Sequence, residues 1–236
     1  SLLARIDEEI IKAQNGYSGS IILKMNSLTD RDIITKLSEA SCAGVKISLI
    51  IRGICCLVPG IPGKTEHIKV ISILGRFLEH SRIYCFGEGK AMDIFISSAD
   101  IMTRNMEKRV EIACPIYDPD LKERIFNILQ VQLNDNVKAR LLQSNKQFIK
   151  RTIIQNEETL NSQLYFMEKA LQSAKQHLAE EESDEELQID DSFTLATDHQ
   201  AMQQMNIAPR RLRRPRIVKQ PRKSRLQLSF KQIKKP

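Results

Sequence analysis

The sequence predicts an α/β protein in which a mixed sheet is flanked by helices and followed by a charged, largely disordered tail. Within residues 20–52, an apolar strand, an amphipathic helix and a second apolar strand follow one another, and short apolar runs continue to residue 116. A third observation concerns the tail, because the composition changes sharply near residue 150. We therefore expect a folded domain at 1–150 and a helical, then low-complexity charged tail at 151–236.

The first elements form a βαβ unit. "SLLARIDEEIIKAQNG" has apolar residues at helical spacing, which predicts a helix that Gly16 ends. A strand at 20–25, a helix from Thr29 or Asp30 to Gly44 and a strand in "VKISLIIRG" then follow through short loops. Elements of these lengths predict a parallel pair of strands. Arg52 would stand at the carboxyl end of the second strand, where open α/β sheets bind ligands.

The later elements are predicted from apolar runs and capping residues. Gly and Pro interrupt residues 53–63, which predicts a loop. A helix opens at "DPDLKERIFNILQVQL", where Asp118 suits the cap and Pro119 the first turn. A further helix is expected at about 161–178, with disorder beyond it. Strands are expected in "IKVISI", "SRIYCF", "DIFISS" and "RVEIACPI", with a short helical turn in "LGRFLE".

Composition excludes several classes of protein. No stretch approaches the roughly 18 continuous apolar residues of a membrane span. The cysteines are odd in number and lack C-x-x-C spacing, which argues against a disulfide or zinc framework and favours reduced, buried thiols in a cytoplasmic protein. These cysteines are Cys42, Cys55, Cys56, Cys85 and Cys114.

The formal net charge of +7 is unevenly distributed. Residues 180–191 hold eight acidic and no basic residues, whereas residues 209–236 hold twelve basic and no acidic ones. Such charge blocks cannot bury enough apolar surface to offset the entropy lost on ordering. The basic run is the feature of this chain that best suits nucleic acid, but it is not regularly interleaved with aromatic residues, which favours a solvated or polyphosphate-attracting extension.

Cationic residues recur at the ends of the predicted strands. His80 and Arg82 stand two apart in "EHSRIYCF", so a strand would aim both side chains at one point. Together with Arg52 and Arg109 they suit an anion with many equivalent oxygens, such as phosphate. The alternatives are a core histidine beside surface arginines, or arginines in surface ion pairs. Another polar cluster, "ISSADIMTRN", contains Arg104 and also fits a capped turn.

Three long segments carry a specific resemblance. They are "LKMNSLTDRDIITKLSEASCAGVKISLIIRGICCLVPG", "ISILGRFLEHSRIYCF" and "ISSADIMTRNMEKRVEIACPI". In the same order, they resemble the carboxy-terminal catalytic region of the bacterial polyphosphate kinases, over about residues 1–145. The resemblance implies a phospholipase D-like domain, the second of a tandem pair in which each domain contributes a histidine to one shared site. It implies reversible transfer of the terminal phosphate of ATP to inorganic polyphosphate.

The resemblance also implies roles for individual residues. His80 would be the partner of a phosphorylated histidine that another domain supplies, so the chain is expected to be a fragment without that domain. Arg52 matches a nucleotide-phosphate contact and Arg109 a contact to the phosphate chain, while Arg82 and Arg104 are added from strand geometry. The expected partners are ATP or ADP, polyphosphate, the missing amino-terminal domains and further copies in a homo-oligomer. Mg²⁺ is expected with ATP, although no carboxylate cluster in this chain suits it.

Two other functions stay open. One is a module that binds polyphosphate or nucleic acid without catalysis. The other is a phosphodiesterase of the phospholipase D type, which would be expected to keep a His-x-Lys pattern where this chain has His80 and Arg82.

Overall fold

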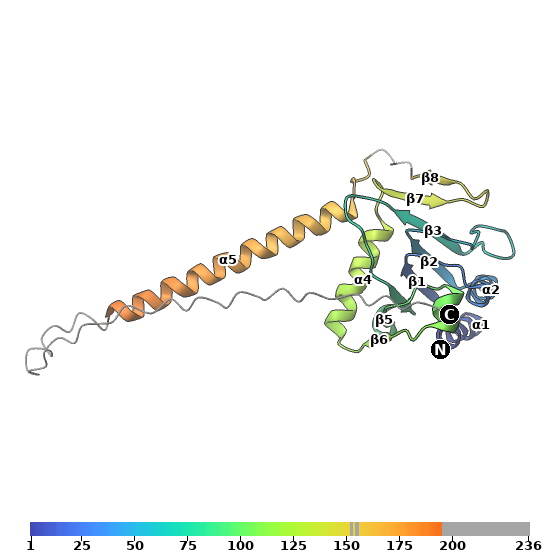
Figure 1. Ribbon diagram of the computed structural model, residues 1–236, viewed down its shortest axis with the longest axis horizontal. Helices are drawn as coiled ribbons and strands as arrows, with labels where there is room; N and C mark the ends of the chain where they lie inside the picture. The colour runs from blue at the N-terminus through green and yellow to red at the C-terminus, as the bar shows by residue number, and fades with distance from the viewer. Residues whose placement is uncertain (152, 154–155, 195–236) are drawn as a thin grey trace, which may run out of the picture. The chain divides into compact units, whose positions relative to one another are not determined.

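Eight strands form one mixed sheet in the computed structural model, which describes residues 1–151, 153 and 156–194. The strand order is β6-β5-β4-β1-β2-β3-β7-β8 (Figure 1). This arrangement confirms the predicted fold class, a mixed sheet flanked by helices. The strands are β1 Ser20–Met25, β2 Lys46–Ile51, β3 Ile68–Ile73, β4 Ile83–Phe86, β5 Asp93–Ser97, β6 Ala113–Ile116, β7 Ala139–Leu142 and β8 Phe148–Lys150.

The central strands β1, β2 and β4 bring three loops together at one edge of the sheet. β1 runs parallel to β2, with Met25 opposite Ile51 at their carboxyl ends, which confirms the predicted parallel pair. β4 runs antiparallel to β1, with Lys24 opposite Ile83, the first residue of β4. The residues that follow β1 and β2 therefore meet the residues that precede β4 at one edge of the sheet.

Helices cover both faces of this sheet. On one face, α1 Leu2–Gln14 and α2 Arg31–Cys42 contribute Ile6 and Leu37 to a core shared with β1 and β2. On the other face, α4 Pro119–Leu133 packs its buried Leu129 against the alternate residues of the same strands (Figure 1). Both faces of the central strands are consequently buried, as expected for parallel strands between helical layers.

The predicted caps are present. Asp30 caps α2 by accepting a hydrogen bond from the Ile33 N–H at 3.1 Å. Asp118 caps α4 by accepting one from the Leu121 N–H at 2.9 Å, and Pro119 follows in the first turn. These side chains satisfy N–H groups that the first helical turn leaves without an intrahelical partner.

Several local predictions were wrong. Residues 74–82 form a loop with no helical turn, and β4 begins at Ile83, so His80 and Arg82 precede the strand. The polar cluster after β5, for which a capped turn was one alternative, leads into a helix, α3 Thr103–Lys108. A strand was expected to begin at Arg109. Instead, Arg109 is the C-cap of α3, and β6 begins only at Ala113. The hairpin of β7 and β8 was not predicted.

The end of the described chain also differs from expectation. The last helix, α5 Ser162–Thr194, continues 16 residues past the expected end at Leu178. Its sequence contains no Gly or Pro, so helix propensity opposes no position strongly. Residues up to Leu178 belong to the same compact unit as the sheet, although a boundary near residue 150 was expected. The disordered tail was expected from residue 179, and its part from residue 195 onward lies outside the described residues.

The five cysteines are free thiols. Of these, Cys85 is buried, Cys55 is half-buried and the other three are exposed, so the expectation that all are buried was wrong. Within the part of the chain that the structure describes, no helix combines the length and the apolar character that crossing a bilayer requires.

Candidate functional site

Asn26 and Arg52 bring the ends of the two parallel strands together. Asn26 follows β1 and Arg52 follows β2. The Arg52 guanidinium donates to Asn26 Oδ1 from Nε at 3.2 Å and from its terminal NH2 at 2.8 Å. Behind it, the Gly53 N–H donates to the Asn26 carbonyl at 2.7 Å. A Cβ at Gly53 would lie 2.8 Å from that carbonyl oxygen, so the close approach of the two loops requires glycine.

Asp100 is the centre of the site. Its Oδ1 accepts hydrogen bonds from the Asn26 backbone N–H at 2.7 Å and from Asn26 Nδ2 at 3.1 Å. The Arg82 guanidinium donates from Nε to Oδ1 at 3.1 Å and from NH2 to Oδ2 at 3.2 Å. The backbone around Asp100 is itself fixed, because the buried Ile101 accepts at its carbonyl from the Thr29 N–H at 2.8 Å.

The charge of Asp100 follows from these contacts. Burial would raise the pKa of the Asp100 carboxyl, but the hydrogen bonds from Arg82 and Asn26 outweigh burial and hold the pKa below its ordinary value. Asp100 is therefore a carboxylate at neutral pH, and it fixes the plane of the Arg82 guanidinium by a two-point contact.

Arg82 in turn positions His80. Its NH1 lies 3.1 Å from His80 Nδ1 and 3.1 Å from the His80 carbonyl oxygen. A guanidinium has no acceptor, so the contact to the ring is a hydrogen bond only when Nδ1 accepts. A neutral His80 then carries its proton on Nε2, and the ring is exposed. The predicted pair therefore meets, although through a loop and not through strand alternation.

A second polar cluster lies beside this network on the α4 face. Lys24 is 5% exposed and forms an ion pair with Glu79, Nζ to Oε2, at 2.8 Å. Gln132 from α4 donates to the same oxygen, and Gln163 from α5 donates to Oε1 at 2.9 Å. Glu79 precedes His80 in the chain, so this cluster fixes the segment that carries the histidine.

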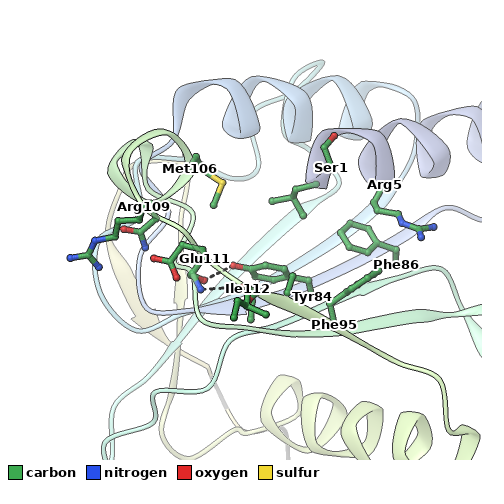
Figure 2. Close-up of a pocket in the computed structure, with 14 residues that line it drawn as sticks. Ser1, Arg5, Tyr84, Phe86, Phe95, Met106, Arg109, Glu111 and Ile112 are labelled. Carbon is green, nitrogen blue, oxygen red and sulfur yellow. Dashed lines mark hydrogen bonds between the residues drawn. The ribbon is translucent and has the colours of Figure 1, made fainter.

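Arg104 and Arg109 lie apart from the network. Both are exposed residues of the α3 region, and within the described residues no hydrogen bond or ion pair joins either of them to Asp100 or His80. Arg109 stands at the rim of a separate cavity of about 460 Å³, and Figure 2 shows its guanidinium directed away from Tyr84. Of the five predicted site residues, the structure thus brings together Arg52, His80 and Arg82.

Tyr84 links the separate cavity to the site. Tyr84, which lines the cavity together with Phe86 and Phe95, donates its hydroxyl to the Ala99 carbonyl at 2.5 Å (Figure 2). Burial chiefly raises the pKa of Tyr84 to about 12. The hydroxyl therefore stays protonated near neutral pH and holds the backbone next to Asp100.

Sequence reasoning missed four residues that build the site. Asp100 was noted only as part of the polar cluster "ISSADIMTRN", without a role of its own, and Asn26, Lys24 and Glu79 had no assigned role. Asn26 could have been found by the rule that pointed to Arg52, because both residues follow parallel strands that are adjacent in the sheet. Pairing of Asp100 with Arg82 depends on the antiparallel placement of β4 and β5, which the sequence pattern does not specify.

The fold and the site define an α/β domain with a cationic site at its strand ends, built around one buried carboxylate. The chain belongs to the polyphosphate kinase family: residues 1–163 match the family model described as polyphosphate kinase C-terminal domain 2.

Three relatives document this membership. The chain is 53% identical over 174 residues to a polyphosphate kinase of Staphylococcus saprophyticus. The aligned region covers 74% of this chain and 24% of the relative. The chain is 55% identical over 172 residues to one of Halalkalibacterium halodurans, covering 72% and 24%. The crystal structure of a Porphyromonas gingivalis polyphosphate kinase superimposes with a TM-score of 0.69 at 42% identity, covering 73% of this chain and 26% of that one. The chain therefore spans about a quarter of the length of these relatives.

Proposed function

We propose that this chain forms the carboxy-terminal half of the active site of a polyphosphate kinase, which reversibly transfers the terminal phosphate of ATP to inorganic polyphosphate. Membership of the family over residues 1–163 supports the reaction class. The observation that carries the proposal is the continuous network Arg52, Asn26, Asp100, Arg82 and His80, which gathers two guanidinium groups and one exposed imidazole at a single sheet edge.

Each residue of the network has a proposed role. His80 directs its Nε2–H to the ligand, because Arg82 occupies Nδ1, and it stabilises the negative charge on the leaving oxygen by donating a hydrogen bond to it. Arg52 stabilises the charge that develops on the oxygens of the transferred phosphoryl group. Asp100 and Asn26 touch no substrate in this scheme. They hold the cations in place before the substrate binds, which avoids a reorganisation cost during the transfer.

The attacking nitrogen comes from another domain in this proposal. A histidine there takes the γ-phosphoryl group as its bond to ADP breaks, and then passes it to the terminal oxygen of polyphosphate, so the transfer has two steps. His80 is the facing partner and is not itself phosphorylated. Assembly into a homo-oligomer and a cytoplasmic location remain predictions from the sequence.

The described residues do not fit a magnesium site of their own. They contain no group of three or more His, Cys, Asp or Glu side chains that could hold a metal ion. The carboxylate within the network, Asp100, is already paired with Arg82, and Glu79, the residue before His80, is paired with Lys24. Mg²⁺ expected with ATP would therefore be held by the phosphates and by residues outside the described chain.

The decisive experiment is a chimera in which residues 1–163 replace the matching segment of the Staphylococcus saprophyticus relative. ATP formation from ADP and polyphosphate should be restored by the wild-type segment and lost with His80→Ala. A chimera with His80→Ala that turns over normally would remove His80 from the site. In parallel, the chain alone incubated with labelled ATP and Mg²⁺ should gain no acid-labile phosphate, and phosphate found on His80 would make it the nucleophile.

A second assay addresses the alternative of a binding module. Filter binding of polyphosphate and of single-stranded DNA by this chain should be compared at two salt concentrations, because contacts to phosphates weaken as salt rises. We expect polyphosphate to bind more tightly than DNA at both. Equal affinity for the two, together with an inactive wild-type chimera, would favour a general anion-binding module.

A further inference from the structure

Gln163 is buried at the start of α5 and reaches the loop that carries His80. Its side chain is 6% exposed within the compact unit. The Phe77 N–H donates to Gln163 Oε1 at 2.9 Å, and Gln163 Nε2 donates to the Phe77 carbonyl at 2.9 Å. The side-chain amide thus pairs with one backbone residue at both its donor and its acceptor, as a neighbouring strand would.

The loop depends on this contact. Among the described residues, 74–81 make no backbone hydrogen bond to other backbone groups, and Leu74, Phe77 and Leu78 are exposed. The backbone of this loop is instead held by side chains: by Gln163 at Phe77 and by Arg82 at the His80 carbonyl. A segment with few backbone bonds and exposed apolar residues is the kind that opens locally at low free-energy cost.

Gln163 also orients Glu79, the residue before His80. Its Nε2 donates to Glu79 Oε1 at 2.9 Å, while Lys24 pairs with Oε2 at 2.8 Å. The carboxylate is therefore fixed at both oxygens, from β1 on one side and from α5 on the other. A fixed Glu79 limits where the His80 backbone can lie.

Gly75 provides the space for Gln163. A Cβ at this position would overlap Gln163 Oε1 and lie 2.8 Å from Cδ. Gly75 is not among the glycines with positive φ, so its backbone conformation is open to other residues and the restriction comes from the amide. The obstacle is the end of a flexible side chain, and an alanine there would displace the amide without disturbing the backbone.

The start of α5 is anchored firmly enough to act as a support. Asp135 Oδ2 accepts from the Ser162 N–H at 2.8 Å and from its hydroxyl at 2.7 Å. Asn136 Nδ2 donates to the Glu158 carbonyl at 2.8 Å, and its Oδ1 accepts from the Leu160 N–H at 2.8 Å. The residue before Gln163 is thus tied to the segment that follows α4.

We propose that Gln163 is a positioning residue for His80, acting through the Phe77 backbone and the Glu79 carboxylate. The inference rests on the proposed function and deepens it, because Gln163 is the support that holds the loop with the His80 imidazole against the network. Loss of the support lets the imidazole leave the position at which Nδ1 accepts from Arg82. Misplacement by about 1 Å can reduce turnover about a hundredfold, so a residue outside the network can control the rate.

The first test uses this chain and needs no activity. Nitrogen-detected NMR of the His80 ring, assigned with His80→Asn, should report the Nε2-protonated tautomer in the wild type and a shift towards the tautomer average in Gln163→Ala. Trypsin should cleave after Arg76 faster in the same variant, because the loop opens more often. The matched control is Gln172→Ala, the same change at an exposed position of the same helix. Identical His80 signals and cleavage rates in the two variants would overturn the proposal.

Two further variants separate hydrogen bonding from packing. Gln163→Met keeps the length and approximate volume of the side chain and removes its hydrogen bonds, so it should behave like Gln163→Ala. A wild-type-like Gln163→Met would assign the effect to packing and contradict the inference. Gly75→Ala should reproduce the Gln163→Ala spectrum by displacing the amide, and the double variant should be no worse than either single one. Additive effects would show that the two residues act separately.

The chimera then links position to catalysis. Gln163→Ala should lower kcat about tenfold to hundredfold and leave the KM for polyphosphate within about twofold, because it removes alignment and not binding. An unchanged kcat with altered His80 signals would contradict the positioning role while leaving the proposed function intact. An inactive wild-type chimera would instead count against the proposed function, and the NMR and proteolysis results would still decide the role of Gln163.

Discussion

The Arg82 guanidinium and the Asp100 carboxylate form a two-point ion pair across 18 residues of sequence, at 3.1 Å and 3.2 Å. The pair is mostly buried, with 14% and 12% of the two side chains exposed. It joins the loop before β4 to the segment before α3, so the same contact that orients the cation also closes the fold at the functional edge.

Asp100→Asn should cost about 3 kcal/mol of the free energy of unfolding, the scale for removing one partner of a buried pair. The new amide can accept from Arg82 with its oxygen, but its NH2 group opposes a guanidinium donor. The measurement is urea unfolding of this chain. Asp93→Asn serves as a control, because Asp93 is a half-exposed partner of Arg5 and Lys122 and its loss should cost less than about 1 kcal/mol. Equal losses of unfolding free energy in the two variants would show that the pair of Arg82 and Asp100 stabilises the fold no more than a surface ion pair does.

Acid should destabilise the chain through Asp100 and Asp135. Burial would raise the pKa of each carboxyl, but hydrogen bonds outweigh it, from Arg82 and Asn26 at Asp100 and mainly from Ser162 and Lys138 at Asp135. A carboxyl with a lowered folded-state pKa stabilises fully above its unfolded pKa of about 3.9, and this stabilisation is lost as pH falls through the folded-state value.

The pH dependence can be assigned with Asp135→Asn. Unfolding free energies measured from about pH 2 to about pH 6 should fall less steeply with acid in this variant than in the wild type, even though the variant is less stable at neutral pH. An unchanged slope would mean that Asp135 binds protons equally in the folded and unfolded states.

Alanine variants of Arg52 and Arg109 should change different kinetic constants of the chimera. Arg52→Ala removes a network cation and should lose at least about 2 kcal/mol of transition-state stabilisation, seen in kcat, with partial recovery in Arg52→Lys. Arg109→Ala, an exposed cation outside the network, should instead raise the KM for polyphosphate with little change in kcat. A fall in kcat alone for Arg109→Ala would place this residue at the reacting phosphate.

The chain should tolerate truncation after Leu178 but not after Lys150. Ending the chain at Lys150 removes Ser162 and leaves Asp135 Oδ2 without two hydrogen bonds, which should cost at least about 3 kcal/mol. Ending at Leu178 keeps the whole compact unit. Thermal unfolding of both truncated chains against the parent is the measurement, and equal melting temperatures for all three would show that residues 156–163 do not stabilise the fold.

Local sequence signals predicted the central part of the fold because each signal acts over short distances. The βαβ unit follows from the periodicity of residues 20–52, and Asp30 and Asp118 cap their helices through bonds to residues three positions ahead. Arg52 was placed correctly for the same reason, since the end of a parallel strand can be recognised without knowledge of the rest of the sheet.

The remaining features depend on contacts between distant segments. The loop that was expected to contain a helical turn has none, and its Phe77 backbone is paired instead with Gln163, 86 residues later. Asp100 pairs with Arg82 because β4 and β5 lie side by side. The residues around Asp100 in the sequence are equally compatible with a turn. His80 and Arg82 were paired by strand alternation, whereas the structure joins them through the Arg82 contact with both the ring and the carbonyl of His80.

The distance in sequence between Phe77 and Gln163 sets an order of events during synthesis. At about 5–20 residues per second, a ribosome adds the intervening 86 residues in roughly 4–17 s, far longer than a loop of this size needs to sample its conformations. The central strands can pair during that interval, but the Phe77 backbone has no hydrogen-bond partner until the start of the last helix emerges. The sheet can thus assemble before the loop that carries His80 gains its support from the carboxy-terminal segment.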